Sequence, residues 1–222
     1  LGVAGIAGNG QKELCEALAG VSFAESGDIV YFNSEPISIT RLDPMKRDKL
    51  GVRIGFVPED RLGMGLIASA DMTDNILLQY YRAGKSVFVN RKEAHRKAEE
   101  LIEQLEIATP GASTPVRLLS GGNIQKVLLG REMKRNPKVL IVAYPTRGLD
   151  VHSSYAVYRL LNQEKQNGTA ILFVGEDLDV LMGISDRIMV LSDHAISGIV
   201  KPKDTTKEKV GYLCVKAGEA GA

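Results

Sequence analysis

Short apolar runs alternate with stretches of helical periodicity along most of this chain, and this alternation constrains the fold more than any other feature. It favours a mostly parallel sheet covered by helices, because parallel strands that are buried on both faces read as continuous apolar runs. We therefore predict an α/β fold, with strands at residues 1–7, 29–32, 53–57, 138–143, 170–174, 187–191 and 196–200.

The strand pattern is interrupted between residues 66 and 122, where helical patterns take over. Helices are predicted at residues 74–81 and 91–107, and apolar residues recur at helical spacing in the second of them. Asn90 is a suitable N-cap for that helix, and the Pro and Gly residues within 107–116 predict a loop behind it. This segment therefore reads as a helical insertion.

Composition excludes several classes of protein. Hydrophobic residues make up 44% of the 222 residues and charged residues 25%, which is typical of a globular chain and not of a disordered one. With 28 Lys and Arg against 27 Asp and Glu, the net charge of +1 gives no basic field for nucleic acid. No apolar run approaches the roughly 20 residues of a membrane span. We expect a soluble chain that binds no nucleic acid.

The cysteines and histidines show no metal-ligand spacing; they are Cys15, Cys214, His95, His152 and His194. We therefore expect no metal site built from them. Two lone cysteines and no secretory leader fit a reducing compartment, so a cytosolic location is expected. The chain begins at Leu1, inside an apolar run, which indicates a piece of a longer polypeptide.

The first predicted strand runs into a glycine-rich loop, G-I-A-G-N-G-Q-K-E, and then into a helix-forming stretch at 14–19. Glycines allow backbone N–H groups to approach an anion at a helix N-terminus. Against the phosphate-binding pattern G-x-x-x-x-G-K followed by Ser or Thr, Gln11 takes the lysine position and Lys12 the hydroxyl position. On its own, the loop could equally be an ordinary turn. The candidate nucleotide-binding residues are Gly5, Gly8, Asn9, Gly10, Gln11, Lys12 and Glu13.

Three further motifs carry a family resemblance over almost the whole chain. Residues 119–126 read L-S-G-G-N-I-Q-K, residues 138–150 read K-V-L-I-V-A-Y-P-T-R-G-L-D, and residues 56–66 read F-V-P-E-D-R-L-G-M-G-L. With the glycine loop, they resemble the ATP-binding cassette (ABC) proteins. The chain is most similar to the second cassette of tandem ATPase subunits that serve bacterial simple-sugar and nucleoside importers.

The resemblance implies one cassette with a P-loop NTPase core at 1–65 and 123–222, a helical signature subdomain at 66–122, and an N-terminal β-subdomain absent from this chain. ATP is the implied cofactor, held between the P-loop of one cassette and the signature of another. The implied partners are a second cassette in the preceding half of the same polypeptide, transmembrane permease subunits and, indirectly, an extracytoplasmic solute-binding protein. The implied location is cytoplasmic, at the inner face of the cell membrane.

The signature would be offered to the partner cassette, whose site would hold Mg²⁺. Ser120 can cap a helix that starts at Gly121 and so aim free N–H groups and a positive dipole end at the partner's γ-phosphate. Alternatively, Ser120 is a simple N-cap, and Asp150 is one for the helix from Val151. The predicted interface residues are Ser120, Gly121, Gly122, Asn123, Gln125 and Asp150.

The chain departs from the family pattern where hydrolysis would occur. The Walker B strand should end in Asp, which supports Mg²⁺, and Glu, which activates water, but Ala143 and Tyr144 stand there. Glu176 takes the position of the switch histidine. Glu59 takes that of a loop glutamine, where a glutamate is familiar in the sugar-importer group. Lys12 either supplies missing charge near the phosphates, giving Mg²⁺-independent binding or none, or is a solvated lysine.

The leading interpretation is a cassette that completes its partner's site and does not hydrolyse ATP alone. Alternatives are a self-sufficient ATPase using Glu13, Glu59 or Glu176, a non-transport ABC protein, and a docking module with an idle signature. The adjacent carboxylates Glu59 and Asp60 could indicate general acid/base catalysis, but a salt bridge in this loop, which precedes Arg61, explains them at least as well and is preferred. Tyr80, Tyr81 and Phe88 are expected in the core, and residues 204–217 predict a last helix.

Overall fold

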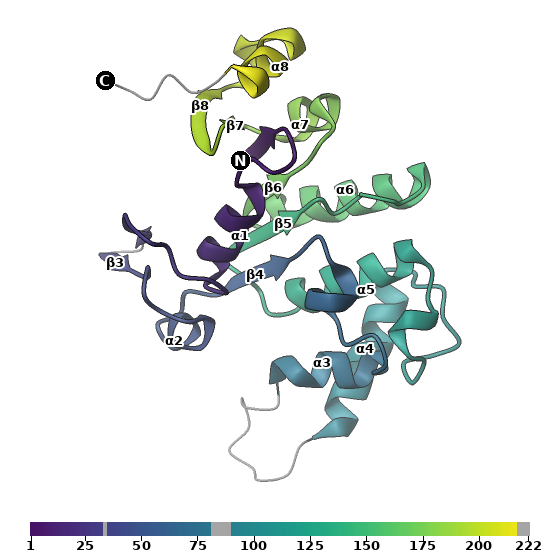
Figure 1. Ribbon diagram of the computed structural model, residues 1–222. Coiled ribbons are helices and arrows are strands. Elements are labelled where there is room, and N and C mark those ends of the chain that lie inside the picture. The colour runs from purple at the N-terminus through teal and green to yellow at the C-terminus, as the bar shows by residue number, and fades with distance from the viewer. Residues whose placement is uncertain (33–34, 81–89, 217–222) are drawn as a thin grey trace.

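The computed structural model describes residues 1–32, 35–80 and 90–216 and has an α/β fold built on a six-stranded sheet (Figure 1). The strand order is β4-β5-β6-β1-β7-β8, and every neighbouring pair is parallel except β7 and β8. The predicted fold class is confirmed. The strands of this sheet are β1 (Gly2–Gly5), β4 (Ile54–Val57), β5 (Val139–Ala143), β6 (Ala170–Val174), β7 (Ile188–Ser192) and β8 (Ala195–Val200).

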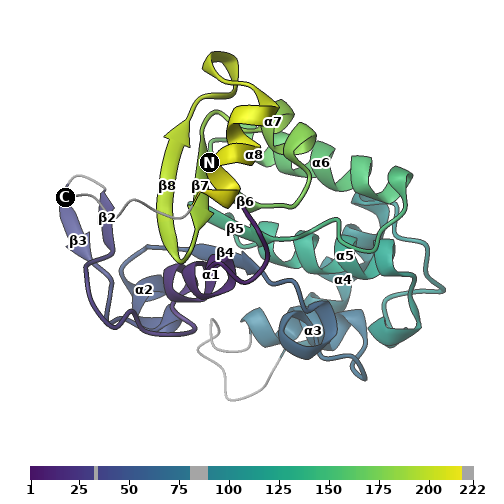
Figure 2. The same cartoon turned by 45° about the horizontal axis from the view of Figure 1, so that its top comes forward.

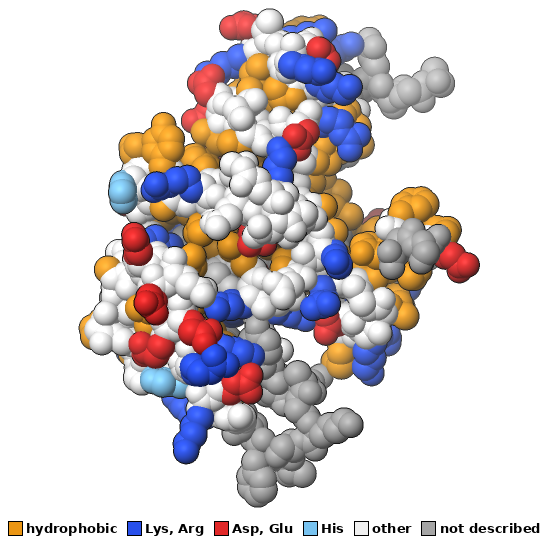
Figure 3. All heavy atoms as spheres, turned by 180° about the vertical axis from the view of Figure 1, so that it is seen from behind, with side chains coloured by type: hydrophobic (Ala, Val, Ile, Leu, Met, Phe, Trp, Pro, Cys, Tyr) orange, Lys and Arg blue, Asp and Glu red, His pale blue; other side chains and the backbone are white. Residues whose placement is uncertain are grey.

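One predicted strand lies outside this sheet. The run at 29–32 forms β2 (Val30–Phe32), which pairs antiparallel with β3 (Pro36–Ser38), a strand that the sequence did not indicate. The two strands are short and partly exposed, with 77% of Phe32 open to solvent. Seen from behind, apolar side chains gather on the surface around this small sheet (Figure 3).

The helices are α1 (Gln11–Ala19), α2 (Pro44–Lys49), α3 (Met72–Tyr80), α4 (Arg91–Gln104), α5 (Gly121–Met133), α6 (Val151–Gln166), α7 (Leu178–Ile184) and α8 (Lys207–Val215). Three short helical turns are η1 (Arg61–Gly65), which is a π-turn, η2 (Val116–Leu118) and η3 (Pro202–Asp204). Helices α3 and α4 lie far from α8 in both ribbon views (Figures 1 and 2). Between Leu66 and Gly122, the described residues contain no strand beyond an isolated bridge from Asp71 to Pro115.

Local chemistry sets the ends of α4. The Asn90 side chain accepts the Glu93 N–H at 3.2 Å, so the predicted N-cap is confirmed. The helix ends before the predicted residue 107, because Glu106 has a φ of 48° and turns the chain out of the helix. The side chains of Tyr80, Tyr81 and Phe88, expected in the core, lie outside the described part of the chain.

Both faces of the six-stranded sheet are buried along its inner strands, whereas β8 at the edge is partly exposed. Along β5, Leu140 and Val142 join the larger apolar cluster, which also includes side chains from α4 to α8, whereas Ile141 and Ala143 pack with α1. This alternation follows from the two-residue period of a strand. It fixes the carboxyl ends of β1, β4, β5 and β6 between the helical layers. No helix in the described part of the chain is long and apolar enough to cross a bilayer.

Candidate functional site

The glycine loop forms a cradle of backbone at the carboxyl end of β1. Gly8 and Gly10 have φ values of 92° and 93°, and Gly10 is the N-cap residue of α1, with no side-chain hydrogen bond to the helix end. A Cβ on Gly5 would lie 2.6 Å from the Leu191 carbonyl oxygen, so this position needs glycine. The first N–H groups of α1 are therefore open to an anion. Asn9 lies in the turn, and its N–H donates to the Ile6 carbonyl at 3.3 Å.

Gln11 closes the loop from the inside. Its side chain is 2% exposed, and Nε2 donates to the Ile6 carbonyl oxygen at 3.0 Å. A Cβ on Gly5 would approach this Nε2 to 2.5 Å, which shows how closely the amide fills the loop. The position that would carry a lysine therefore holds a neutral amide that is bonded to the protein's own backbone.

Lys12 is exposed on the first turn of α1, beside the cavity that this helix lines. Its side chain is 70% exposed, and Nζ lies 3.8 Å from Glu16 Oε1, one helical turn along α1. This geometry is that of a solvated lysine with a weak (i, i+4) ion pair. Glu13 is also exposed in the first turn of α1, where its charge complements the helix dipole.

A cavity of about 490 Å³ lies between α1 and the ends of β4 and β5. Ala143 and Tyr144 line it at the end of β5, and they are 5% and 9% exposed. Tyr144 has a φ of 47°, which is uncommon for an aromatic residue, and its N–H donates to the Val174 carbonyl at 2.9 Å. Burial raises the pKa of Tyr144, and the negative charges of Glu176 and Glu59 raise it further. The side chains of Ala143 and Tyr144 are a methyl group and a phenol, so the end of β5 carries no carboxylate.

Arg147 joins the two acidic positions beside this cavity. Its guanidinium pairs with the Glu59 carboxylate, lies 3.2 Å from Glu176 Oε1, and stands 5.6 Å from the centroid of the Tyr144 ring. The hydrogen bond to Glu59 raises the pKa of Arg147, and the charges of Glu59 and Glu176 add to that effect. The three charged side chains are 42% to 51% exposed, so solvent screens each pair.

The structure gives the 58–60 loop a different salt-bridge partner from Arg61 and adds a residue to the site. The 58–60 loop forms no ion pair with Arg61, because Glu59 reaches Arg147 instead, and Asp60 accepts the Gly63 N–H at 2.7 Å to cap η1. Arg61 donates to the Arg147 carbonyl oxygen at 2.5 Å, and burial lowers its pKa. The sequence motifs did not predict that Arg147 contacts both Glu59 and Glu176. The available signal was an arginine inside the P-T-R-G-L-D motif, in a chain that carries glutamates just after two other predicted strands.

The signature motif begins a helix at the surface. Ser120 Oγ accepts the Asn123 N–H at 3.4 Å and its side-chain amide at 2.9 Å, so Ser120 is the N-cap of α5. Ser120 and Gly121 are exposed. A Cβ on Gly121 would meet Arg61 and Leu149 at 3.6 Å, whereas one on Gly122 would lie 2.4 Å from Ser153 Oγ.

Gln125 is a correction to the predicted interface. It has no exposed surface, because the second turn of α5 packs against the core. Neither polar atom of its side chain has a hydrogen-bond partner in the structure. A side chain in this position cannot contact another cassette's nucleotide directly.

Asp150 is both exposed and a helix cap. Its carboxylate accepts the Ser153 N–H at 2.9 Å and the Ser153 hydroxyl at 2.7 Å. The hydrogen bond from that hydroxyl, followed by the one from the N–H, lowers the pKa of Asp150. The predicted N-cap of α6 is therefore present, and the residue still lies at the surface.

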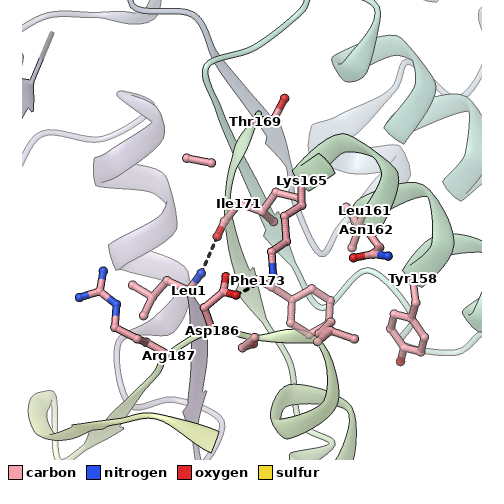
Figure 4. A pocket seen from close by; sticks show the side chains of 13 residues that line it. Leu1, Tyr158, Leu161, Asn162, Lys165, Thr169, Ile171, Phe173, Asp186 and Arg187 are labelled. Atoms are coloured by element: carbon pink, nitrogen blue, oxygen red, sulfur yellow. Dashed lines mark hydrogen bonds and ion pairs between the residues drawn. The ribbon is translucent and has the colours of Figure 1, made fainter. Parts of the chain in front are cut away.

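A second cavity, of about 300 Å³, lies at the amino ends of β1 and β6 (Figure 4). Lys165 Nζ pairs with Asp186 Oδ1 at 2.7 Å beside it, and the Leu1 amino group donates to the Ile171 carbonyl at 2.8 Å. Because the glycine loop follows the carboxyl end of β1, this cavity lies at the opposite end of the strand. It contains none of the predicted site residues.

A strand, glycine loop and helix, together with a surface helix that begins at S-G-G, define a nucleotide-binding domain of the cassette type. The sequence profile of the ABC transporter family matches residues 1–147, and the chain belongs to that family. It is 41% identical to the nucleoside import ATP-binding protein NupA of Lactococcus lactis subsp. cremoris, over 97% of this chain and 42% of the relative. It is 40% identical to the guanosine import ATP-binding protein NupO of Bacillus subtilis, over 96% of this chain and 41% of that protein.

The chain is also 35% identical to the ribose import ATP-binding protein RbsA 1 of Rubrobacter xylanophilus, over 99% of this chain and 44% of the relative. It thus spans about two fifths of the length of the curated relatives it matches. Among solved structures, a dimeric ATP-binding cassette in a post-hydrolysis state with ADP and Pi superposes with a TM-score of 0.74. That match covers 90% of this chain and 84% of the other at 24% identity, which shows a shared fold.

Proposed function

We propose that this chain is one cassette of an ATP-driven importer, and that it completes the ATP site of a partner cassette without hydrolysing ATP at its own. The observation that carries this proposal is the contrast between the two surfaces. The signature helix α5 is capped and exposed at Gly121, whereas Ala143 and Tyr144 stand where a metal-supporting aspartate and a water-activating glutamate would be needed.

The residues of this chain's own site do not fit a magnesium ion. Mg²⁺ takes oxygen ligands, but Ala143 presents a methyl group and Lys12 an ammonium that points to solvent. Each carboxylate that lines the cavity already has a partner in the protein: Glu59 is paired with Arg147, Asp60 accepts the Gly63 N–H, and Glu16 lies 3.8 Å from Lys12 Nζ. No group of three or more His, Cys, Asp or Glu side chains is arranged for a metal among residues 1–32, 35–80 and 90–216.

Nucleotide at this site would be held by backbone alone. The N–H groups at the start of α1, after Gly10, suit phosphate oxygens, but Gln11 supplies no charge and the exposed Lys12 ammonium lies 3.8 Å from Glu16 Oε1. We therefore propose binding that is weak and independent of Mg²⁺, or absent. Glu59 and Glu176, which could serve a self-sufficient ATPase, are engaged by Arg147, so that alternative is not favoured.

The transported solute is proposed from the relatives. Two of them are named for the import of nucleosides and of guanosine, and they share more identity with this chain than the relative named for ribose. We propose nucleoside import first and simple-sugar import second. The proposed partners are a second cassette in the remainder of the polypeptide, permease subunits and a solute-binding protein, with the cassettes at the cytoplasmic face of the membrane.

The test uses the complete ATP-binding subunit assembled with its permease. Gly121→Ala is expected to lower transport-coupled ATP hydrolysis at least tenfold, because the methyl group would stand between the helix N–H groups and the partner's phosphate. The fold should tolerate it, since the added Cβ meets its neighbours at 3.6 Å. Gly183→Ala, with nothing within 4 Å, is the matched control. Unchanged hydrolysis in Gly121→Ala would refute the signature role, and hydrolysis by this cassette alone would refute the inactive site.

A further inference from the structure

Three loops leave the main sheet side by side at its carboxyl edge. They follow β4, β5 and β6, which are adjacent in the sheet, and they carry Glu59, residues 144–150 and Glu176. In the proposed function, these are the loops that would otherwise be organised by a bound nucleotide and its metal. What holds them here must come from the protein.

Arg147 makes contacts with all three loops. One end of its guanidinium pairs with Glu59 after β4, and the other end lies 3.2 Å from Glu176 after β6. Its own loop provides the Tyr144 ring, 5.6 Å from the guanidinium carbon. Without this cation, two carboxylates would face one another across the end of β5 and repel. The cation therefore joins the loops and neutralises the acidic pair.

The backbone of Arg147 is connected to both interface elements. The Arg147 carbonyl oxygen accepts a hydrogen bond from Arg61 at 2.5 Å, and the Arg61 side chain lies beside Gly121 of the signature. Asp150 is three residues further along the same loop, which two turn hydrogen bonds fold: Arg147 N–H to Tyr144 at 3.2 Å, and Leu149 N–H to Thr146 at 3.1 Å. A change in the placement of Arg147 would move both surfaces.

We propose that Arg147 is a positioning residue that holds the loops after β4, β5 and β6 together, so that the signature and Asp150 face the partner cassette without nucleotide at this chain's own site. This inference rests on the proposed function and extends it to a residue that touches no nucleotide. The ion pairs of Arg147 do the work that a phosphate and a metal would do in a hydrolysing site.

The experiment uses the complete ATP-binding subunit with its permease. Arg147→Ala is expected to lower kcat for ATP hydrolysis at least fivefold and to leave KM for ATP within twofold, because the partner's P-loop, which binds that ATP, is untouched. Arg147→Lys keeps the charge and can hold one carboxylate, so it should recover part of the loss. Arg159→Ala is the matched control, since Arg159 is exposed on α6.

Two further measurements separate positioning from simple stabilisation. Amide hydrogen exchange in Arg147→Ala should accelerate together in 58–60, 144–150 and 175–177, and in the unchanged subunit it should respond little to ATP in these loops. The effects of Arg147→Ala and Glu176→Gln should not add, because a neutral residue 176 removes the repulsion that Arg147 relieves. If Arg147→Ala does not fold, Arg147→Lys and Glu176→Gln provide the same comparison.

A kcat within twofold of the unchanged protein, or faster exchange confined to 144–150, would overturn the role of Arg147. Loss through KM alone would also overturn it. Gly121→Ala then distinguishes the two proposals: if it is impaired while Arg147→Ala is not, the signature role stands and the positioning role fails. If Gly121→Ala is fully active, the proposed function itself is wrong.

Discussion

At the scale of single residues, several positions of the candidate site hold side chains that are buried or bonded to the protein itself. Gln11 bonds its own loop, and Cys15 is 1% exposed beneath the cavity that Ala143 and Tyr144 line. Burial, with a smaller effect from the charge of Glu16, raises the pKa of Cys15 to about 12. A thiol in this state is a packing group and a poor nucleophile.

The raised pKa of Cys15 predicts a pH dependence of stability. An unfolded thiol has a pKa of about 8.5, so above that pH the unfolded state loses its proton while the folded state keeps it until about pH 12. The free energy of unfolding should therefore fall as pH rises across this window. Cys15→Ala should make the fall shallower, as measured by urea unfolding at a series of alkaline pH values.

The two proteins are compared by the slope of the free energy of unfolding against pH and not by its absolute value, because Cys15→Ala also removes buried volume. Cys214 remains in both proteins and serves as the internal control, since burial raises its pKa as well. Identical slopes for the two proteins would contradict the prediction. Rapid alkylation of native Cys15 near pH 8 would contradict it equally.

At the scale of elements, the close approach of two helices fixes the surface at which we propose that a partner cassette binds. The start of α5 lies against the start of α6, where Ser153 donates to Asp150 and leaves no room for a Cβ on Gly122. Adjacent glycines in the same signature therefore have different roles. Gly121 keeps the helix end open, and Gly122 allows the two helices to meet.

This difference predicts opposite effects on stability. Alanine is preferred over glycine within a helix by up to about 1 kcal/mol, so Gly121→Ala should leave stability unchanged or raise it. Gly122→Ala should instead lower the free energy of unfolding by about 1–3 kcal/mol, because the methyl group forces the Ser153 hydroxyl away from Asp150, the N-cap of α6. Urea unfolding of the two variants measures both signs. Equal free energies of unfolding for the two variants would contradict this prediction, because they would show that α5 and α6 can move apart without loss of stability.

The sequence identified most elements because their signals are local. Continuous apolar runs located all six strands of the main sheet, and Asn90 located the start of α4. The strand and helices that it missed, β3, α2 and α7, have 3, 6 and 7 residues, too few for a periodic pattern. The run at 29–32 was a strand, but its sheet depended on pairing with residues that carried no strand signal.

At the scale of the whole molecule, the sequence supplied the list of site residues but not their contacts. It indicated that Ala143, Tyr144 and Glu176 are unusual residues at their motif positions, since the spacing of a motif can be read from the chain alone. It could not bring Arg147 between Glu59 and Glu176, because that contact depends on the order of β4, β5 and β6 in the sheet. The prediction that Gln125 lies at the interface was wrong for a related reason, because the burial of its side chain depends on what α5 packs against.

The absence of fitting metal ligands predicts how nucleotide binding should respond to chelation. We expect the affinity of this chain's own site for ATP to change less than twofold between Mg²⁺ and EDTA, since Ala143 and Lys12 offer no oxygen to the ion. The measurement is calorimetric titration of the complete subunit with the partner cassette's P-loop lysine substituted. A tenfold or greater dependence on Mg²⁺ would contradict this prediction.

The buried amide of Gln11 has a consequence for attempts to convert this domain into an active ATPase. Its Nε2 satisfies the Ile6 carbonyl within a space that is 2% exposed, so a lysine introduced there would have its ammonium held inside the loop and not directed at phosphate. Ala143 and Tyr144 would still lack carboxylates, and Arg147 would still occupy Glu59 and Glu176. Single reversions should therefore fail, and a designer would have to rebuild the loop, the strand end and the arginine together.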